Sequence, residues 1–190
     1  MRSQKLYQKY SSGRHWEKHP TIYAEIFAEF LKSVNFKGLV VDIGSGNGRD
    51  VNTFSLFGFK SIGIDNSKKE INACKKKFPE LKFEVQNTEK LKFKDNSIGA
   101  FFMINVIHYV NKEKAIKEIF RVLKPNGYFF IHFNIKIIDK SRKVDYYYTE
   151  KDILRLISKF KIVSKKVFGR IDLSPIKHKH KIMEVILQKL

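Results

Sequence analysis

The chain has 190 residues, and 43% of them are hydrophobic, which is enough to form one sizeable core. No apolar run reaches the roughly 18 residues of a membrane span. The polar start of the chain, Met1–Lys5, does not lead into the apolar stretch of a secretory signal. The single cysteine, Cys74, excludes an internal disulfide. We therefore expect one soluble, cytoplasmic domain without membrane attachment.

The formal net charge of +19 is the most unusual property of the composition. A large excess of cations favours binding to nucleic acid or another polyanion. The cations, however, are 31 lysines and 7 arginines spread along the whole chain. Arginine recognises phosphate in a bidentate manner, whereas scattered lysine is typical of a solvated surface. A polyanion site and an unselected surface charge therefore both stay open.

The chain begins with a helix, strand, helix pattern. Apolar residues recur on one helical face over 21–34, and Pro20 fits a first helical position. The short β-branched run over 39–43 predicts a buried strand. A helix over 47–57 should follow it and end at Gly58.

The same alternation continues through the middle of the chain. A second strand is predicted over 61–65, and Ser67 and Glu70 have capping-box spacing for the helix behind it. Apolar runs over 81–85 and 98–104 predict the third and fourth strands.

A further helix and strand precede the last part of the chain. The helix, with apolar residues from 115 to 123, should end before the turn signal at 125–127, and a fifth strand is expected over 128–133. Thr149 and Asp152 then suggest a cap for one more helix.

Two strand-like runs, 161–168 and 181–187, close the sequence with no convincing helix between them. Strands that alternate with helices form right-handed crossovers and a parallel sheet covered by helices on both faces. We therefore predict a three-layer α/β fold of about seven strands, mostly parallel, with an antiparallel C-terminal pair at one edge. Ligands of such sheets bind at the carboxyl ends of the strands.

A glycine-rich loop, Gly44–Gly48, follows the first strand directly. Glycines at every second position let the backbone turn sharply and let a ligand approach. The next helix points its free amides and positive dipole end at this turn. Arg49 stands where a dinucleotide fingerprint needs its third glycine, and no Gly-Lys-Ser/Thr follows, so a P-loop is excluded. A purely structural turn is the alternative.

Polar residues also follow the other predicted strands. Asp65 ends the second strand, 23 residues after Asp42, and a carboxylate there can accept both hydroxyls of a ribose. A helix-capping role for Asp65 is the alternative. Residues 86–89 follow the third strand and Asn105 follows the fourth. Polar groups at four successive strand ends predict a single ligand cleft.

Beyond these features, the sequence resembles the class I S-adenosylmethionine-dependent methyltransferases. The matching segments keep the family's order and spacing: Val40–Gly48, Gly63–Ser67, Glu89–Ile98, Asn105–Val110 and Glu118–Gly127. The resemblance implies a Rossmann-like fold for residues 1–190 as one domain. Within it, 1–37 would form an N-terminal lid and helix, 38–133 the cofactor-binding core and 134–190 the substrate side. Trp16 would belong to the lid or simply pack.

The resemblance also implies roles in binding S-adenosylmethionine, with S-adenosylhomocysteine as the product. Asp42 would support the glycine loop, and the loop would hold the methionine portion through Gly44, Ser45, Gly46, Asn47 and Gly48. Asp65 would bind the ribose hydroxyls, while Asn66, Asn87 and Thr88 would lie around the adenine. Asn105 would approach the sulfonium. Many relatives have Gly-Asp-Ala in place of Gln86-Asn87-Thr88, so adenine binding here would lack a charged acceptor.

The implied reaction is an in-line displacement, in which positioning does most of the work. A general base is needed only if the acceptor must lose a proton. The candidate bases are His108, His132 and His180. Further candidates are His178, which precedes the last strand-like run, and the tyrosines at 146–148, in the segment after the fifth strand. His108 could instead be only the histidine of the family's usual Asn-x-x-His pattern, without a catalytic role. His132 could be a core histidine with a hydrogen-bond partner. We assign no metal, because the histidines alone make a poor zinc site.

The acceptor is the least determined part of the prediction. The chain has no Asn/Asp-Pro-Pro-Tyr/Phe signature of adenine-amino methyltransferases and no Pro-Cys nucleophile, which favours a small-molecule acceptor. The C-terminal part is loosely similar to small tellurite-resistance-type methyltransferases. An RNA-directed methyltransferase and a non-catalytic S-adenosylmethionine-binding module are the alternatives. The oligomeric state stays open.

Overall fold

A computed structural model describes residues 21–138, 144–172 and 178–190, without the side chains of 144–146 and 172. The predictions for Pro20 and for a lid containing Trp16 lie outside the described residues. Within the described segments, no helix is both long and apolar enough to cross a bilayer.

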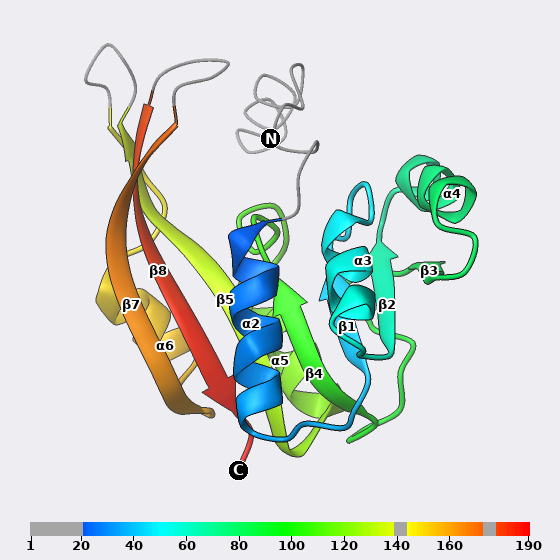
Figure 1. Cartoon of the computed structure of the whole chain (residues 1–190). Helices are drawn as coiled ribbons and strands as arrows, with labels where there is room; N and C mark the ends of the chain where they lie inside the picture. Colours follow the sequence, from blue (N-terminus) through cyan, green and yellow to red (C-terminus); the bar gives the residue numbers. More distant parts are fainter. Residues whose placement is uncertain (1–20, 139–143, 173–177) are drawn as a thin grey trace.

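The described strands form one sheet that confirms the predicted α/β architecture (Figure 1). Its order is β3-β2-β1-β4-β5-β8-β7, and β6 pairs with β5 off this path. The strands are β1 Val40–Ile43, β2 Ser61–Asp65, β3 Lys82–Val85, β4 Ile98–Met103, β5 Leu123–Ile138, β6 Val144–Tyr146, β7 Lys161–Asp172 and β8 His178–Gln188. The first five pair in parallel, whereas β8 runs antiparallel to both β5 and β7. The predicted antiparallel C-terminal edge pair is thereby confirmed.

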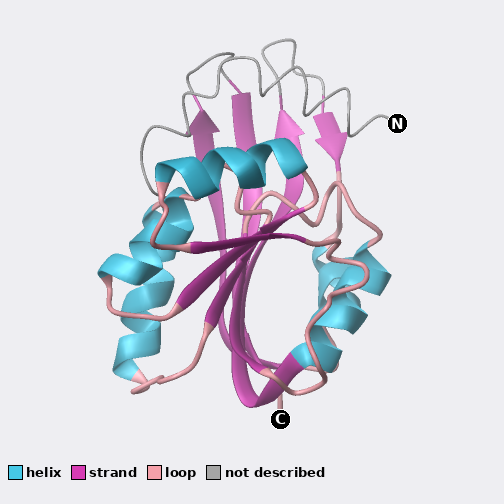
Figure 2. Cartoon of the chain, turned by 90° about the vertical axis from the view of Figure 1, so that its right-hand side faces the viewer, coloured by secondary structure: helices cyan, strands magenta, loops and turns pink. Residues whose placement is uncertain are grey.

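Helices cover both faces of the sheet (Figure 2). Their bounds are α2 Ile22–Ser33, α3 Arg49–Leu56, α4 Lys68–Lys77, α5 Lys112–Val122 and α6 Glu150–Leu156. On one face, α2 and α3 pack on Val40, Phe102 and Phe130. On the other face, α5 and α6 pack on the opposite side chains of the same strands. The three-layer prediction is therefore confirmed.

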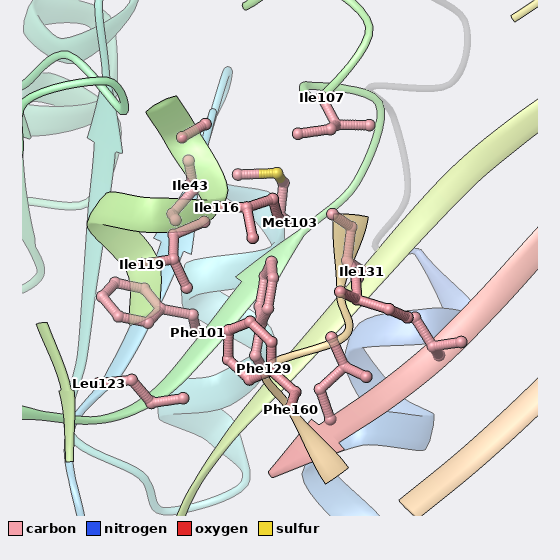
Figure 3. Packing of buried hydrophobic residues seen from close by; sticks show 14 of the residues in the cluster. Ile43, Phe101, Met103, Ile107, Ile116, Ile119, Leu123, Phe129, Ile131 and Phe160 are labelled. Carbon is pink, nitrogen blue, oxygen red and sulfur yellow. The ribbon is translucent and has the colours of Figure 1, made fainter. Parts of the chain in front are cut away.

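The larger core lies between α5 and the central strands (Figure 3). Phe101 of β4 and Phe129 of β5 meet Ile119 of α5 there, and all three are fully buried. Burying a side chain of this size contributes roughly 1.5–3 kcal/mol each. This packing fixes the central strands on which the carboxyl-end loops are built.

Strand register brings the carboxyl ends of the central strands level with one another. Ile43 of β1 lies beside Ile64 of β2 and Met103 of β4, while Asp65 lies beside Val85 of β3. The residues that follow these positions therefore meet at one edge of the sheet. This is the edge at which the sequence predicted a ligand cleft.

The bounds of β5 differ from the prediction. The strand begins at Leu123, directly after α5, because Leu123 pairs with Ile98 and the register shifts before the pair Ala100 and Tyr128. The predicted turn residues 125–127 lie within the first, irregular part of β5, where Asn126 has a left-handed φ of 62°. The strand continues to Ile138 because β6 and β8 pair with its last residues. The short strand β6 was not predicted.

Candidate functional site

A cavity of about 500 Å³ opens at the carboxyl ends of β1, β2 and β4. Its volume lies in the range of small-molecule sites. Among the predicted site residues, those that line it are Asp42, Gly44, Ser45, Gly46, Asn47, Asp65, Asn66, Asn87, Thr88 and Asn105. Gly48 does not line it. The structure therefore brings these strand-end loops together around one cavity.

The glycine loop turns under the cavity and starts α3. The backbone N–H groups of Gly44 and Ser45 both donate to the carbonyl oxygen of Ile64, at 2.8 and 3.0 Å. Gly44 has a φ of 72°, and a Cβ there would lie 2.1 Å from Cγ2 of Val106. The loop after β4 thus packs directly on the glycine loop, and only glycine allows this approach.

Gly48 serves the fold rather than the cavity wall. It precedes α3 in a left-handed conformation, with a φ of 77°. A Cβ at this position would lie 2.8 Å from the ring of Phe83 and 3.2 Å from Sγ of Cys74. The absence of a side chain at Gly48 therefore lets the start of α3 pack closely on Phe83 of β3 and Cys74 of α4. Gly48 contacts these residues and does not line the cavity.

Asp65 connects the two sides of the cavity. Its Oδ2 accepts a hydrogen bond from the backbone N–H of Gly46 at 3.2 Å, and its Oδ1 accepts one from the backbone N–H of Ser67 at 2.8 Å. Ser67 itself caps α4. Two backbone donors hold the carboxylate in place, which is the preorganisation that a binding group needs.

A second pair of carboxylates lies deeper in the cavity wall. Asp42 is 4% exposed and Asp50 is 8% exposed. Burial raises the pKa of Asp42 well above its usual range, and the negative charges of Asp50 and Asp65 raise it further. Burial also raises the pKa of Asp50, although hydrogen bonds from Thr21 and the charge of Arg49 oppose this. A cationic ligand group bound beside these acids would favour their ionised forms and so oppose the raised pKa values.

Asp50 is a site residue that the sequence prediction missed. Its Oδ1 accepts hydrogen bonds from the N–H and the hydroxyl of Thr21, at 2.9 and 3.1 Å. Arg49 Nε lies 3.7 Å from its Oδ2. The available signal was an acidic residue in the first turn of the helix that follows a glycine loop, where acids stabilise the helix dipole.

The loops after β3 and β4 complete the rim. The side-chain oxygen of Asn87 accepts from the backbone N–H of Glu89 at 2.8 Å, in a tight local turn. Asn105 adopts a left-handed φ of 59°, which an asparagine tolerates better than most residues. The remaining wall after β4 is partly apolar and was not fully predicted; it comprises Ile104, Val106, Tyr109 and Val110.

None of the three predicted histidines, His108, His132 and His180, lines the cavity. His108 Nε2 accepts a hydrogen bond from the backbone N–H of Asn134 at 3.2 Å. A backbone amide can only donate, so the proton of the neutral ring lies on Nδ1. That Nδ1 atom is buried and has no hydrogen-bond partner among the described residues. Burial, and repulsion from His132 and His180, lower the pKa of His108 to about 3.

His180 and His132 belong to the same neighbourhood but make different contacts. His180 Nδ1 lies 3.1 Å from the side-chain oxygen of Asn134, so Asn134 connects the rings of His108 and His180. His132 is 3% exposed and its Nε2 lies 3.3 Å from Oε2 of Glu184. Burial lowers the pKa of His132 although Glu184 opposes this. The geometry around His132 is that of a partnered core histidine.

The aromatic residues before α6 frame His108. Its ring centre lies 5.2 Å from that of Tyr147 and 5.5 Å from that of Tyr148. The Tyr148 hydroxyl donates to the carbonyl oxygen of Ile107 at 3.3 Å. These contacts attach the segment between β6 and α6 to the loop after β4. In the described part of the chain, no three His, Cys, Asp or Glu side chains are placed to share a metal ion.

The middle of the chain is similar to a known protein family. A family model described as a methyltransferase domain matches residues 41–131. The match runs from β1 to the middle of β5, so it contains the glycine loop, Asp65 and the loops after β3 and β4.

Two curated relatives match a similar portion of the chain. An uncharacterized methyltransferase of Schizosaccharomyces pombe is 30% identical over 105 residues, which are 55% of this chain and 42% of the relative. A sterol 4-C-methyltransferase of Caenorhabditis elegans is 31% identical over 115 residues, which are 56% of this chain and 34% of the relative. The matched segment thus spans less than half the length of either relative.

Solved structures share the fold. A methyltransferase from Methanosarcina mazei, described as S-adenosylmethionine-dependent, aligns with a TM-score of 0.68 at 21% identity, over 81% of this chain and 93% of its own. At this identity the similarity supports the architecture alone. The residues matched by the family model include those that line the cavity at the carboxyl ends of the strands.

Proposed function

We propose that this chain, which matches a methyltransferase-domain family model over residues 41–131, is a class I S-adenosylmethionine-dependent methyltransferase and transfers the methyl group of S-adenosylmethionine to a small-molecule acceptor. The observation that carries the proposal is Asp65, which is held by two backbone N–H groups at the rim of a cavity built from four strand-end loops. When bound, S-adenosylmethionine supplies a methyl group on a sulfonium, which leaves as S-adenosylhomocysteine.

The residues present fit this cofactor. A cavity of about 500 Å³ is of the size class that holds such a molecule. Its buried acids, Asp42 and Asp50, complement a ligand that carries positive charge on both its sulfonium and its ammonium group. Gly44 leaves space where any side chain would collide with Val106. Ser45 offers a buried hydroxyl with no hydrogen-bond partner among the described residues.

We assign the binding roles by position around the cavity. The loop from Gly44 to Asn47 would hold the methionine portion, and the carboxylate of Asp65 would accept hydrogen bonds from the ribose hydroxyls. Asn66, Asn87 and Thr88 would enclose the adenine. The side-chain oxygen of Asn87 already accepts from the N–H of Glu89, so it has one lone pair left for the adenine. Asn105 would lie nearest the sulfonium.

The acceptor would lie against the wall after β4. This wall combines apolar side chains with the half-exposed ring of Tyr109. A relative that matches 56% of the chain is a sterol methyltransferase, which supports a small organic acceptor. Catalysis would come mainly from holding the acceptor in line. A base is required only for an acceptor that loses a proton. His108 Nε2 already accepts from the N–H of Asn134, so His132 and His180 are the remaining candidates among the three predicted histidines.

Calorimetry with S-adenosylmethionine and S-adenosylhomocysteine tests the cofactor. We expect both to bind, and Asp65→Ala to weaken binding by about 1–3 kcal/mol through loss of charge-assisted hydrogen bonds. Asp95→Ala, which changes the same residue type outside the cavity, is the matched control. Absence of binding to either compound would overturn the proposal, and wild-type affinity in Asp65→Ala would show that the ribose assignment is wrong.

A methyl-transfer screen with radiolabelled cofactor then separates the acceptor classes. Small organic acceptors and total RNA are supplied in parallel. Label in a small acceptor supports the proposal. Label in RNA alone would favour an RNA-directed enzyme, and cofactor binding without transfer to any acceptor would favour a non-catalytic binding module.

A further inference from the structure

A second cavity lies between α5 and α6, on the sheet face opposite α2. It measures about 350 Å³ and shares no lining residue with the cavity at the strand ends. Its walls are one face of α5 from Lys112 to Phe120, and α6 with the turn that follows it to Phe160. We call this cavity the α5–α6 groove. Nothing in the proposed methyl transfer uses it.

The floor of the groove is apolar. It consists of Ile116 and Phe120 from α5, and Leu156 and Phe160 from the other wall. The rings of Phe120 and Phe160 meet edge to face with their centres 5.0 Å apart. Ile116 and Phe160 are nearly buried, whereas Phe120 and Leu156 are partly exposed into the groove. Binding of an apolar group would remove this exposed surface from water, which is thermodynamically favourable.

The rim of the groove is cationic. Two of its cations are partly neutralised, because Lys112 lies 3.9 Å from Glu113 and Arg155 lies 3.6 Å from Asp152. The other two, Lys117 and Lys159, have no carboxylate within ion-pair distance among the described residues. Lys159 lies above the ring of Phe120, with its Nζ 5.8 Å from the ring centre. Net positive charge therefore stands directly beside the apolar floor.

We propose that the α5–α6 groove binds a single-chain amphipathic anion, such as a fatty-acid carboxylate. Its hydrocarbon tail covers the floor formed by Ile116, Phe120, Leu156 and Phe160, and its anionic head lies at the rim lysines Lys117 and Lys159. The volume falls within the range of small-ligand sites, roughly 300–1,000 Å³.

The dimensions favour such a ligand over a partner protein. The α5 wall runs for nine residues, about 12 Å of helix, and α6 has seven residues. A stable protein interface buries about 800 Å² on each partner, far more than the floor of this groove offers. A single-chain amphiphile needs only an apolar slot and a cation at its end.

Dodecanoate is the probe, and its binding is measured by displacement of the fluorescent anion 8-anilinonaphthalene-1-sulfonate and by calorimetry. The charge variant is Lys117→Glu/Lys159→Glu. Its matched control is Lys114→Glu/Lys151→Glu, which makes the same change of charge on α5 and α6 at positions outside the groove. We expect the charge variant to lose roughly tenfold or more in dodecanoate affinity and the control to lose little.

A second pair of variants tests the floor. Leu156→Gln should weaken dodecanoate binding, whereas Leu154→Gln, on the exposed side of the same helix, should not. Circular dichroism establishes that all four variants are folded. Equal losses in the groove and control variants would mean that binding is non-specific and would overturn the proposal.

Other occupants are distinguished in the same experiment. The wild-type protein is also offered vesicles of anionic phospholipid and an acidic amphipathic helical peptide. If either binds at the groove while dodecanoate does not bind, the proposed occupant is wrong. Because the groove and the strand-end cavity share no lining residue, failure here leaves the methyltransferase proposal intact.

Discussion

Asp42 is a carboxylate that the fold keeps at the end of β1 in spite of its burial. Its raised pKa means that, at pH values between the pKa in the unfolded chain and the pKa in the native protein, the native protein holds a proton that the unfolded chain has released. The unfolding free energy contributed by this group therefore falls as the pH rises above the usual range of an aspartate. A residue that costs stability in this way is typical of a binding site.

We predict that Asp42→Asn raises the melting temperature of the ligand-free protein at neutral pH and weakens S-adenosylmethionine binding. The stability gap to the wild-type protein should narrow as the pH falls from about 8 to about 4, because Asp42 then regains its proton. Thermal unfolding across this range and calorimetry at pH 7 are the measurements. Glu80→Gln, at an exposed carboxylate, is the control for the loss of one negative charge. A lower melting temperature for Asp42→Asn at pH 7 would contradict the prediction.

His108 offers a donor rather than a lone pair. Since Nε2 accepts from Asn134 and the pKa is about 3, the ring stays neutral with its proton on Nδ1. We predict that nitrogen NMR of histidine-labelled protein shows this single tautomer between about pH 5 and pH 8. His108→Gln, which can keep an acceptor near Nε2, should preserve stability better than His108→Asn, which keeps only the donor near Nδ1. An imidazolium signal for His108 at pH 6 would refute this.

Single residues at strand ends could be predicted from the sequence, whereas those on helices could not. Asp42, Asp65 and Asn105 were found because a strand end has a fixed place in a parallel sheet. Asp50 was missed because the direction of a helical side chain depends on how the helix packs. The contact between His132 and Glu184 joins residues 52 positions apart, and no local pattern predicts such a pairing.

At the scale of elements, local signals predicted helix starts better than strand limits. The capping box at α6 is present as expected, since the Thr149 hydroxyl accepts from the N–H of Asp152 and the Asp152 carboxylate accepts from the N–H of Thr149. The start of β5 was misplaced because it depends on pairing with Ile98 and on Lys189, whose N–H donates to the carbonyl oxygen of Gly127.

The cap of α6 gives a prediction for an element. Thr149→Ala should lower the free energy of unfolding by about 1 kcal/mol, within a range of 0.5–2 kcal/mol, because the first turn of α6 loses its hydroxyl partner. Thr149→Ser keeps the hydroxyl and should stay close to the wild-type value. Urea unfolding followed by circular dichroism measures both. Equal stability of the alanine and serine variants would show that the capping box contributes nothing.

At the scale of the whole molecule, the net charge of +19 leads to a prediction about polyanions. Because the cations are mostly lysines spread over the chain, we expect RNA to bind weakly, without sequence preference and with an affinity that falls steeply with salt. Fluorescence anisotropy with two unrelated RNA sequences at several salt concentrations measures this. Tight, salt-resistant binding to one sequence only would instead indicate a selected RNA site.

The sheet order has a consequence for the protein while it is being made. Strand β7 leaves the ribosome before β8, yet among the described strands β8 is its only neighbour. Until β8 is synthesised and inserted next to β5, the apolar residues Ile162, Val163 and Val167 have no sheet to join. A nascent chain at this stage exposes an unpaired, aggregation-prone strand of the kind that molecular chaperones bind. Pairing of β8 with β5 and β7 is thus the step that removes this exposed strand edge during synthesis.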